Sequence, residues 1–80
     1  MAKQSIPRCP TPRALELLYA LYVCQQEQIQ PTNAELAERC SFASLPLVHY
    51  HLRTLAHHAL IRSVRVRTLT RKGSRLIANS

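Results

Sequence analysis

Arginines recur in the stretch LIRSVRVRTLTRKG, residues 60–73, where they alternate with apolar or small residues. A guanidinium group carries a permanent charge and a planar set of donors that matches phosphate oxygens and the acceptor edge of guanine. The whole chain has 11 Lys and Arg against 4 acidic residues, which gives a formal net charge of +7. This excess predicts a polyanionic partner, and nucleic acid is the first candidate.

The remaining residue types give little support to catalysis or metal binding. The chain has one glycine and no aspartate, so it lacks a glycine-rich phosphate loop and an aspartate-based acid–base pair. The histidines cluster in one segment but have no matching cysteine or carboxylate at metal-ligand spacing. They are His49, His51, His57 and His58. We therefore expect no catalytic residue, no metal and no cofactor, in a protein that is not an enzyme.

The cysteines and the apolar runs indicate in which cellular compartment the protein is expected. Cys9, Cys24 and Cys40 are odd in number and have no CxxC spacing, so we expect neither a disulfide framework nor a thiolate metal site. The longest uncharged apolar run, Leu17 to Cys24, is far shorter than the roughly 20 residues that span a bilayer. The N-terminus also lacks an apolar signal core. We expect a cytoplasmic protein with reduced thiols and no membrane partner.

These side chains need a scaffold, and the sequence predicts three helices ahead of the arginine-rich stretch. Residues 1–10 contain two prolines and no periodicity, which predicts a flexible arm before a single domain at residues 11–80. Thr11 and Pro12 have the residue types of a helix cap and a first helical position. The first helix should therefore begin at Pro12 and fade near Gln28.

The next two helices are short and well delimited. Thr32 and Glu35 have the spacing of a capping box, which predicts a helix from Asn33 to about Cys40. Ser44 is expected to cap a third helix. The apolar residues of that helix recur at helical spacing and predict its buried stripe: Val48, Leu52 and Leu55.

A change of period after Leu60 predicts β-structure. In IRSVRVRTL, apolar and basic residues alternate and β-branched residues are frequent, as in a short antiparallel hairpin. Thr70 then caps a last short helix. The predicted fold is mainly α with a small antiparallel β-hairpin, in the order α-α-α-β-β-α of a winged helix-turn-helix.

Three segments resemble known regulators. TPRALELL and TNAELAERCSFASLPLVHYHLRTLAHHALIRS resemble the DNA-binding domain of LexA repressors, and RTLTRKG resembles the strand-to-helix junction of MarR-type regulators. The resemblance covers residues 11–77 and implies a winged-helix transcriptional repressor. In such proteins the third helix enters the major groove, the start of the second helix rests on phosphate, and the wing lies along the backbone or minor groove.

Two turn positions depart from this family, because Ser41 and Ala59 stand where it usually has glycine. Left-handed backbone at either residue costs about 1 kcal/mol relative to glycine. The chain also carries no counterpart of the LexA protease domain, so none of that chemistry is expected here.

The third helix supplies the predicted base contacts. With its apolar stripe buried, helical spacing turns Leu45, Pro46, His49, Tyr50 and Arg53 outward. Arg53 is the first choice for a guanine contact, because its fork matches the two acceptors of that base. His49 and Tyr50 are placed to reach bases or phosphates. Pro46 is placed to touch a thymine methyl group, with an apolar contact to the next helix as an equal alternative.

The predicted phosphate contacts come from the helix starts and from the hairpin. The resemblance places three of them at helix starts: Thr32, Asn33 and Ser44. The hairpin adds Arg62, Arg65 and Arg67, which would bracket a phosphate backbone or enter a narrow minor groove. The alternative is that these arginines are solvated charges that protect an edge strand from aggregation.

The first helix is apolar nearly all round, and one small core does not cover both of its faces. The residues left over are predicted to pack on a second subunit, on another partner or on the last helix: Leu15, Tyr19, Tyr22 and Val23. A symmetric homodimer would fit the two half-sites of a palindromic operator. The alternative is that the N-terminal arm folds back over this face.

The sequence therefore predicts a sequence-specific double-stranded DNA-binding transcriptional regulator. A small repressor of the kind carried by phages or plasmids is expected, because no ligand-sensing segment accompanies the DNA-binding pattern and no small-molecule ligand is evident. The alternative is a winged-helix module that binds a protein or RNA through its apolar first helix.

Overall fold

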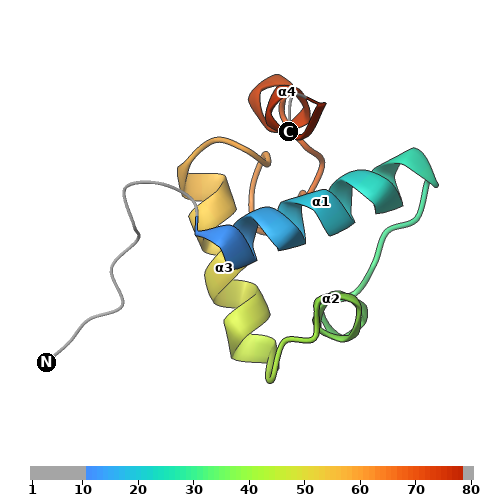
Figure 1. Ribbon diagram of the computed structural model, residues 1–80, viewed down its shortest axis with the longest axis vertical. Coiled ribbons are helices and arrows are strands. Elements are labelled where there is room, and N and C mark those ends of the chain that lie inside the picture. The colour runs from blue at the N-terminus through green and yellow to red at the C-terminus, as the bar shows by residue number, and fades with distance from the viewer. Residues whose placement is uncertain (1–10, 79–80) are drawn as a thin grey trace, which may run out of the picture.

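The computed structural model describes residues 11–78, which form four helices joined by loops (Figure 1). The helices are α1 (Pro12–Gln26), α2 (Asn33–Cys40), α3 (Leu45–His57) and α4 (Arg71–Ala78). The predicted arm at residues 1–10 lies outside the described residues. None of the helices between residues 11 and 78 combines the length and the apolar character that crossing a membrane requires.

Local signals in the sequence fix where the first two helices begin. The Thr11 hydroxyl accepts the Ala14 N–H at 3.2 Å, as expected for a cap. The predicted capping box is confirmed, because the Thr32 N–H donates to the Glu35 carboxylate at 2.9 Å and the Glu35 N–H donates to the Thr32 hydroxyl at 3.1 Å. Two donors at the start of α2 are thereby satisfied within the chain.

The start of α3 differs from the expected cap. Ser44 occupies the cap position in extended backbone, but its side chain makes no capping hydrogen bond. Pro46 is the second residue of the helix and has no N–H, so one of the two amides that a cap usually bonds is missing. The Ser44 hydroxyl is therefore left on the exposed surface.

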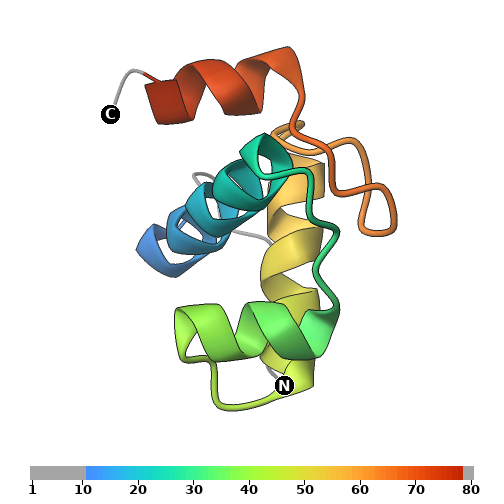
Figure 2. The same ribbon diagram turned by 90° about the vertical axis from the view of Figure 1, so that its right-hand side faces the viewer.

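The core forms where α1 lies against the other three helices, with α4 and α2 on opposite sides of it (Figures 1 and 2). The predicted buried stripe of α3 is confirmed: Val48, Leu52 and Leu55 are fully buried. They meet Leu36 of α2 and a set of residues from α1: Ala14, Leu17, Leu18 and Leu21. Burial of these side chains fixes which face of α3 remains outside.

The predicted β-hairpin is wrong, because residues 11–78 contain no β-strand and only one isolated antiparallel bridge, between Ile61 and Leu69. Ser63 and Val66 close a tight turn, in which the Ser63 N–H donates to the Val66 carbonyl at 3.0 Å and the Val66 N–H donates to the Ser63 hydroxyl at 2.9 Å. Because Ser63 and Val66 bond each other in this turn, they are not available for a longer series of hydrogen bonds between two strands. The winged-helix order is therefore corrected to four helices with an arginine loop, residues 62–68, between α3 and α4.

Three helix ends among the described residues use left-handed backbone without glycine, and Gln28, with φ 60°, is the one that follows α1. Ser41 ends α2 with φ 58°, and Ala59 follows α3 with φ 60°. Ser41 and Ala59 are the two turn positions at which the resemblance predicts glycine. Each position therefore carries about 1 kcal/mol of backbone strain relative to glycine, which the packing of the helices must offset.

The one glycine of the chain lies where α4 meets the end of α3. The Thr70 hydroxyl accepts the Gly73 N–H at 3.1 Å and donates to the Ala59 carbonyl at 2.5 Å, so it joins the two helix ends. A Cβ atom on Gly73 would lie 2.1 Å from the Leu60 carbonyl oxygen. Glycine is therefore what allows α4 to approach the backbone at Leu60.

We predict that Gly73→Ala lowers the free energy of unfolding by about 1–3 kcal/mol, because the added methyl group collides with backbone that has little room to move. This loss should appear although alanine is the better helix former. Urea denaturation followed by circular dichroism measures it. Lys72→Ala, at an exposed position of the same helix, is the matched control and should stay within about 0.5 kcal/mol of the wild type. Equal midpoints for the two variants would contradict the prediction.

Candidate functional site

One ridge of α3 is exposed from its first turn to its third. Pro46, His49 and Arg53 follow each other at spacings of three and four residues, and all three are exposed. Tyr50, also predicted to face outward, is half-buried, and its ring meets His51 edge-on with ring centroids 5.2 Å apart. The ridge thus carries a guanidinium and an imidazole one turn apart, and both can donate hydrogen bonds to base or phosphate acceptors.

The arginine loop separates the three arginines that were predicted to share a role. Arg62 and Arg65 are exposed, whereas Arg67 is half-buried. The Arg67 Nε donates to the Val64 carbonyl at 3.1 Å, and its Nη1 donates to the Pro31 carbonyl at 3.0 Å. The predicted arrangement, with Arg62 on the first strand and Arg65 and Arg67 on one face of the second, is wrong because residues 62–68 form a loop. Arg67 holds the loop against the residue that precedes the cap of α2.

A groove of about 780 Å³ lies between the end of α1, the α1–α2 loop, the start of α2 and the arginine loop. It brings together four of the predicted contact residues: Thr32, Asn33, Arg65 and Arg67. Within residues 11–78, the Asn33 Oδ1 is buried and has no hydrogen-bond partner. The groove also holds Gln25, whose Oε1 accepts the Leu69 N–H at 3.0 Å and fixes the loop from the other side. Its wall combines amide and guanidinium groups on one side of the molecule.

The start of α2 is less suited to phosphate than the resemblance implies. The capping box already uses the amides of Thr32 and Glu35, and it places the Glu35 carboxylate at this helix end. A carboxylate there offsets the positive end of the helix dipole. Positive charge at the groove therefore comes from Arg65 and Arg67, of which Arg65 is the exposed one.

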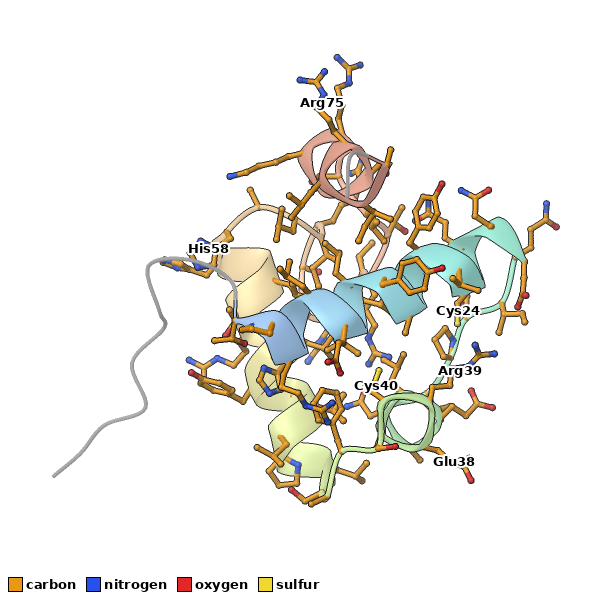
Figure 3. All side chains as sticks on the ribbon, in the orientation of Figure 1. Cys24, Glu38, Arg39, Cys40, His58 and Arg75 are labelled. Carbon is orange, nitrogen blue, oxygen red and sulfur yellow. The ribbon has the colours of Figure 1, made fainter. Side chains whose placement is uncertain are left out.

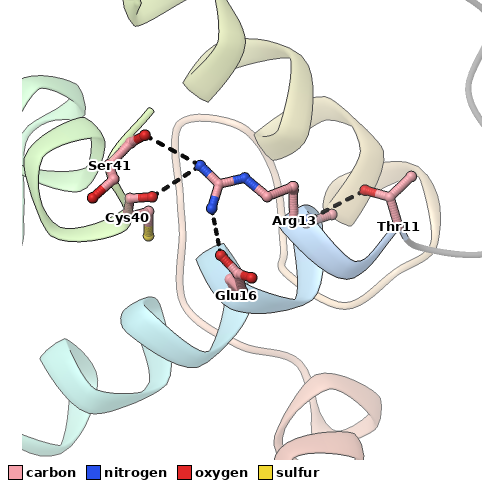
Figure 4. Close-up of polar contacts among 6 residues, drawn as sticks. Thr11, Arg13, Glu16, Cys40 and Ser41 are labelled. Atoms are coloured by element: carbon pink, nitrogen blue, oxygen red, sulfur yellow. Dashed lines mark hydrogen bonds and ion pairs between the residues drawn. The ribbon is translucent and has the colours of Figure 1, made fainter. Parts of the chain in front are cut away.

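The position of the α2–α3 turn depends on Arg13 (Figure 4). Its Nη2 donates to the Cys40 carbonyl at 2.9 Å and to the Ser41 carbonyl at 3.3 Å, and its Nη1 pairs with Glu16 at 2.5 Å. These carbonyls end α2, so a side chain of α1 satisfies the C-terminus of another helix. The sequence analysis did not assign this role to Arg13. The signal that could have indicated it is a cation in the first turn of a helix, which is unfavourable with the helix dipole unless the cation finds acceptors on another element.

Two aromatic rings continue this contact into α3. The Arg13 Cζ lies 4.3 Å from the centroid of the Phe42 ring, and Phe42 stacks on His51 with centroids 5.0 Å apart. His51 is 8% exposed, and its Nδ1 is buried without a hydrogen-bond partner among residues 11–78. Burial, and then the neighbouring Arg13 cation, lower the pKa of His51 below its usual value of 6.5. The neutral ring is therefore the form that fits this stack.

The described residues offer no site for a metal ion or a reactive thiol. No group of three His, Cys, Asp or Glu side chains among residues 11–78 is placed to hold a metal. Cys24 is buried, and burial is also the main cause that raises the pKa of the half-buried Cys40 thiol. A raised pKa keeps that thiol protonated and a weak nucleophile.

The predicted interface residues of α1 fall into two groups. Tyr19 is 58% exposed, whereas Leu15, Tyr22 and Val23 are half-buried. Leu15 and Tyr19 line an apolar groove of about 470 Å³ between α1 and α4, called the α1/α4 groove below. Leu76, on the α4 side of the groove, is 40% exposed. The homodimer stays a prediction.

Comparison of the chain with family models, curated proteins and solved structures finds no match. The resemblance to winged-helix repressors stays a prediction, and the missing hairpin removes the wing from it. Function must therefore be argued from the exposed ridge of α3, the two grooves and the distribution of charge.

We predict that the protein loses stability as the pH falls from about 7 to 5, because the unfolded chain binds the His51 proton more tightly than the folded chain does. The folded pKa is lowered, so the stabilisation is complete above the unfolded value of 6.5 and is lost as the pH falls through the folded value. Urea midpoints at a series of pH values measure this loss. His51→Phe keeps a ring against Phe42 and should flatten the profile over this range.

His57→Gln is the matched control, because it removes an exposed histidine of the same helix. It should keep the wild-type pH profile. A His51→Phe variant that loses as much stability as the wild type between pH 7 and 5 would refute the assignment to His51.

Proposed function

We propose that this protein binds double-stranded DNA and regulates transcription, with α3 in the major groove. The observation that carries the proposal is the exposed ridge of Pro46, His49 and Arg53 on a helix whose other face is buried, in a chain of net charge +7. An α-helix fits the width of the major groove, where each base pair presents a distinct pattern of donors and acceptors. The short turn from α2 to α3 agrees with a helix-turn-helix docking geometry.

The residues on the ridge have different roles in this proposal. Arg53 donates two hydrogen bonds to a guanine, and His49, one turn earlier, reaches a neighbouring base or phosphate. Pro46 contacts a thymine methyl group. Ser44 lies at the start of the helix with a hydroxyl that makes no cap, so it can donate to a phosphate at that end.

The arginine loop supplies affinity beyond the other end of α3. Arg62 lies five residues after the last residue of α3, and Arg65 lies beside the polar groove, so both side chains extend the basic surface past the helix. Each phosphate neutralised by such a side chain releases counterions and adds affinity without sequence preference. Arg67 is excluded from this role, since its guanidinium bonds two carbonyl oxygens.

Between activation and repression, we favour repression, because it needs no contacts beyond those with DNA. Occupancy of an operator is enough to block transcription, so the contacts named above are sufficient for it. We place this activity in the cytoplasm, together with the DNA that it would bind.

We predict that Arg53→Ala weakens binding to the sequence that the wild type selects from a random DNA pool by about 10- to 100-fold, through loss of a bidentate base contact. Binding to unrelated DNA should change much less. Fluorescence anisotropy with the selected duplex and a scrambled duplex measures both affinities. Arg75→Ala is the charge-matched control, because Arg75 points away from α2 at the far end of the molecule (Figure 3). If Arg53→Ala and Arg75→Ala lost equal affinity on both duplexes, Arg53 would contribute only its charge and no base contact.

Arg65 and Arg67 of the arginine loop should behave differently. Arg65→Ala is expected to reduce the slope of log affinity against log salt by about 0.9, the value for one phosphate contact, with unchanged stability. Arg67→Ala is expected to lower the urea midpoint, because it removes the bonds to Val64 and Pro31. Anisotropy across a salt series and urea denaturation of both variants test this division. An unchanged midpoint in Arg67→Ala, or no DNA binding by the wild type at low salt, would count against this account.

A further inference from the structure

The first turn of α3 exposes apolar side chains at the end of the molecule opposite α4 (Figure 1). Leu45, Pro46 and Leu47 are the first three residues of this helix and are called the apolar tip below. Leu45 is 50% exposed and Leu47 is 41% exposed, whereas Val48, the next residue, is fully buried. Apolar surface therefore meets solvent where the ridge of Pro46, His49 and Arg53 begins.

The size and surroundings of the apolar tip favour DNA over a protein as its occupant. The tip has three residues, whereas a stable protein interface uses roughly 20–30 residues a side. Among residues 11–78, the other exposed large apolar side chains lie on α1, α4 or the loops and do not extend the tip along α3. His49 and Arg53 continue the ridge from Pro46, and residues 41–57 contain no acidic side chain. The tip is thus continuous with the surface proposed for DNA.

We propose that the apolar tip reads the C5-methyl group of pyrimidines, and that it binds thymine and 5-methylcytosine alike. This proposal rests on the proposed function, with α3 in the major groove. The N-terminal residues of a recognition helix contact base edges, and the C5-methyl group of thymine is the apolar feature of that groove. Methylation of cytosine at C5 puts the same group at the same place on a C·G pair.

The side chains of the apolar tip do not distinguish the polar atoms beside that methyl group. Thymine presents the O4 acceptor there, whereas cytosine presents the N4 amino donor. Leucine and proline side chains neither donate nor accept hydrogen bonds, and Pro46 also has no N–H. The methyl contact adds affinity through burial of apolar surface alone. A 5-methylcytosine site is therefore held as a thymine site is, and the unmethylated cytosine site is held more weakly.

The length of the ridge predicts where the methyl group lies relative to the guanine. Pro46 and Arg53 are seven residues apart, which is about 10 Å along a helix axis. This distance corresponds to about three base-pair steps of DNA at roughly 3.4 Å each. With α3 along the groove, the pyrimidine methyl group should lie about three base pairs from the guanine that Arg53 contacts.

Base changes in the duplex that the wild type selects from a random pool test the proposal without changing the protein. Uracil at the thymine position lacks the methyl group but keeps every hydrogen-bonding group, so it should weaken binding about three- to fivefold, the effect of one methyl contact. A C·G pair should weaken binding at least as much, and 5-methylcytosine should restore the affinity to within about twofold of the T·A duplex. Fluorescence anisotropy measures all four affinities. Equal affinities for the thymine and uracil duplexes would overturn the proposal.

Variants of the protein assign the methyl contact to the apolar tip. Leu45→Ser/Pro46→Ser/Leu47→Ser changes exposed positions, and it should make the affinities for the thymine and uracil duplexes equal. Val66→Ser, an exposed apolar position in the arginine loop, is the matched control and should keep the wild-type ratio. An unchanged ratio in the triple variant would refute the assignment to the tip.

Failure of the methyl reading is distinguishable from failure of the proposed function. Sequence-selective DNA binding with no preference for thymine over uracil would overturn the methyl reading alone. A selected sequence without thymine near the guanine would do the same. Absence of DNA binding by the wild type at low salt would overturn both proposals.

Discussion

The contact of Arg13 with the end of α2 is the interaction on which the rest of the structure depends. Its guanidinium satisfies the Cys40 and Ser41 carbonyls, balances Glu16 and covers the Phe42 ring, which in turn stacks on His51. One side chain thus joins α1, the α2–α3 turn and α3. The turn itself contains a strained left-handed residue, so it needs such support to hold α3 at a fixed angle.

The described arginines of the chain fall into two groups: some bond backbone carbonyls within the fold, and others stay exposed to solvent. Arg13 and Arg67 direct their donors at backbone carbonyls, where a planar fork can satisfy two acceptors at once. They position the turn and the arginine loop and are half-buried in doing so. Arg53, Arg62 and Arg65 remain exposed. A count of basic residues therefore overestimates the charge that is available to a polyanion, because part of it is used inside the fold.

Features decided by neighbouring residues could be predicted from the sequence, and features decided by distant contacts could not. The capping box of Thr32 and Glu35 depends on residues three positions apart, and it is present. The hairpin was expected from alternation alone, but its segment is too short for both a turn and a ladder. The contact between Arg13 and Ser41 joins residues 28 positions apart, and no local period encodes it. The predicted contact set consequently included Arg67, whose partners lie in another part of the chain.

Glu16 connects the α1/α4 groove to the end of α2. It lines the α1/α4 groove and also pairs with Arg13, which holds the end of α2. A charged group that entered this groove would meet the same ion pair that neighbours the α2–α3 turn. The pair is about half exposed, which keeps its energy small and its rearrangement easy. The Arg13–Glu16 pair therefore joins this groove to the support of the α2–α3 turn.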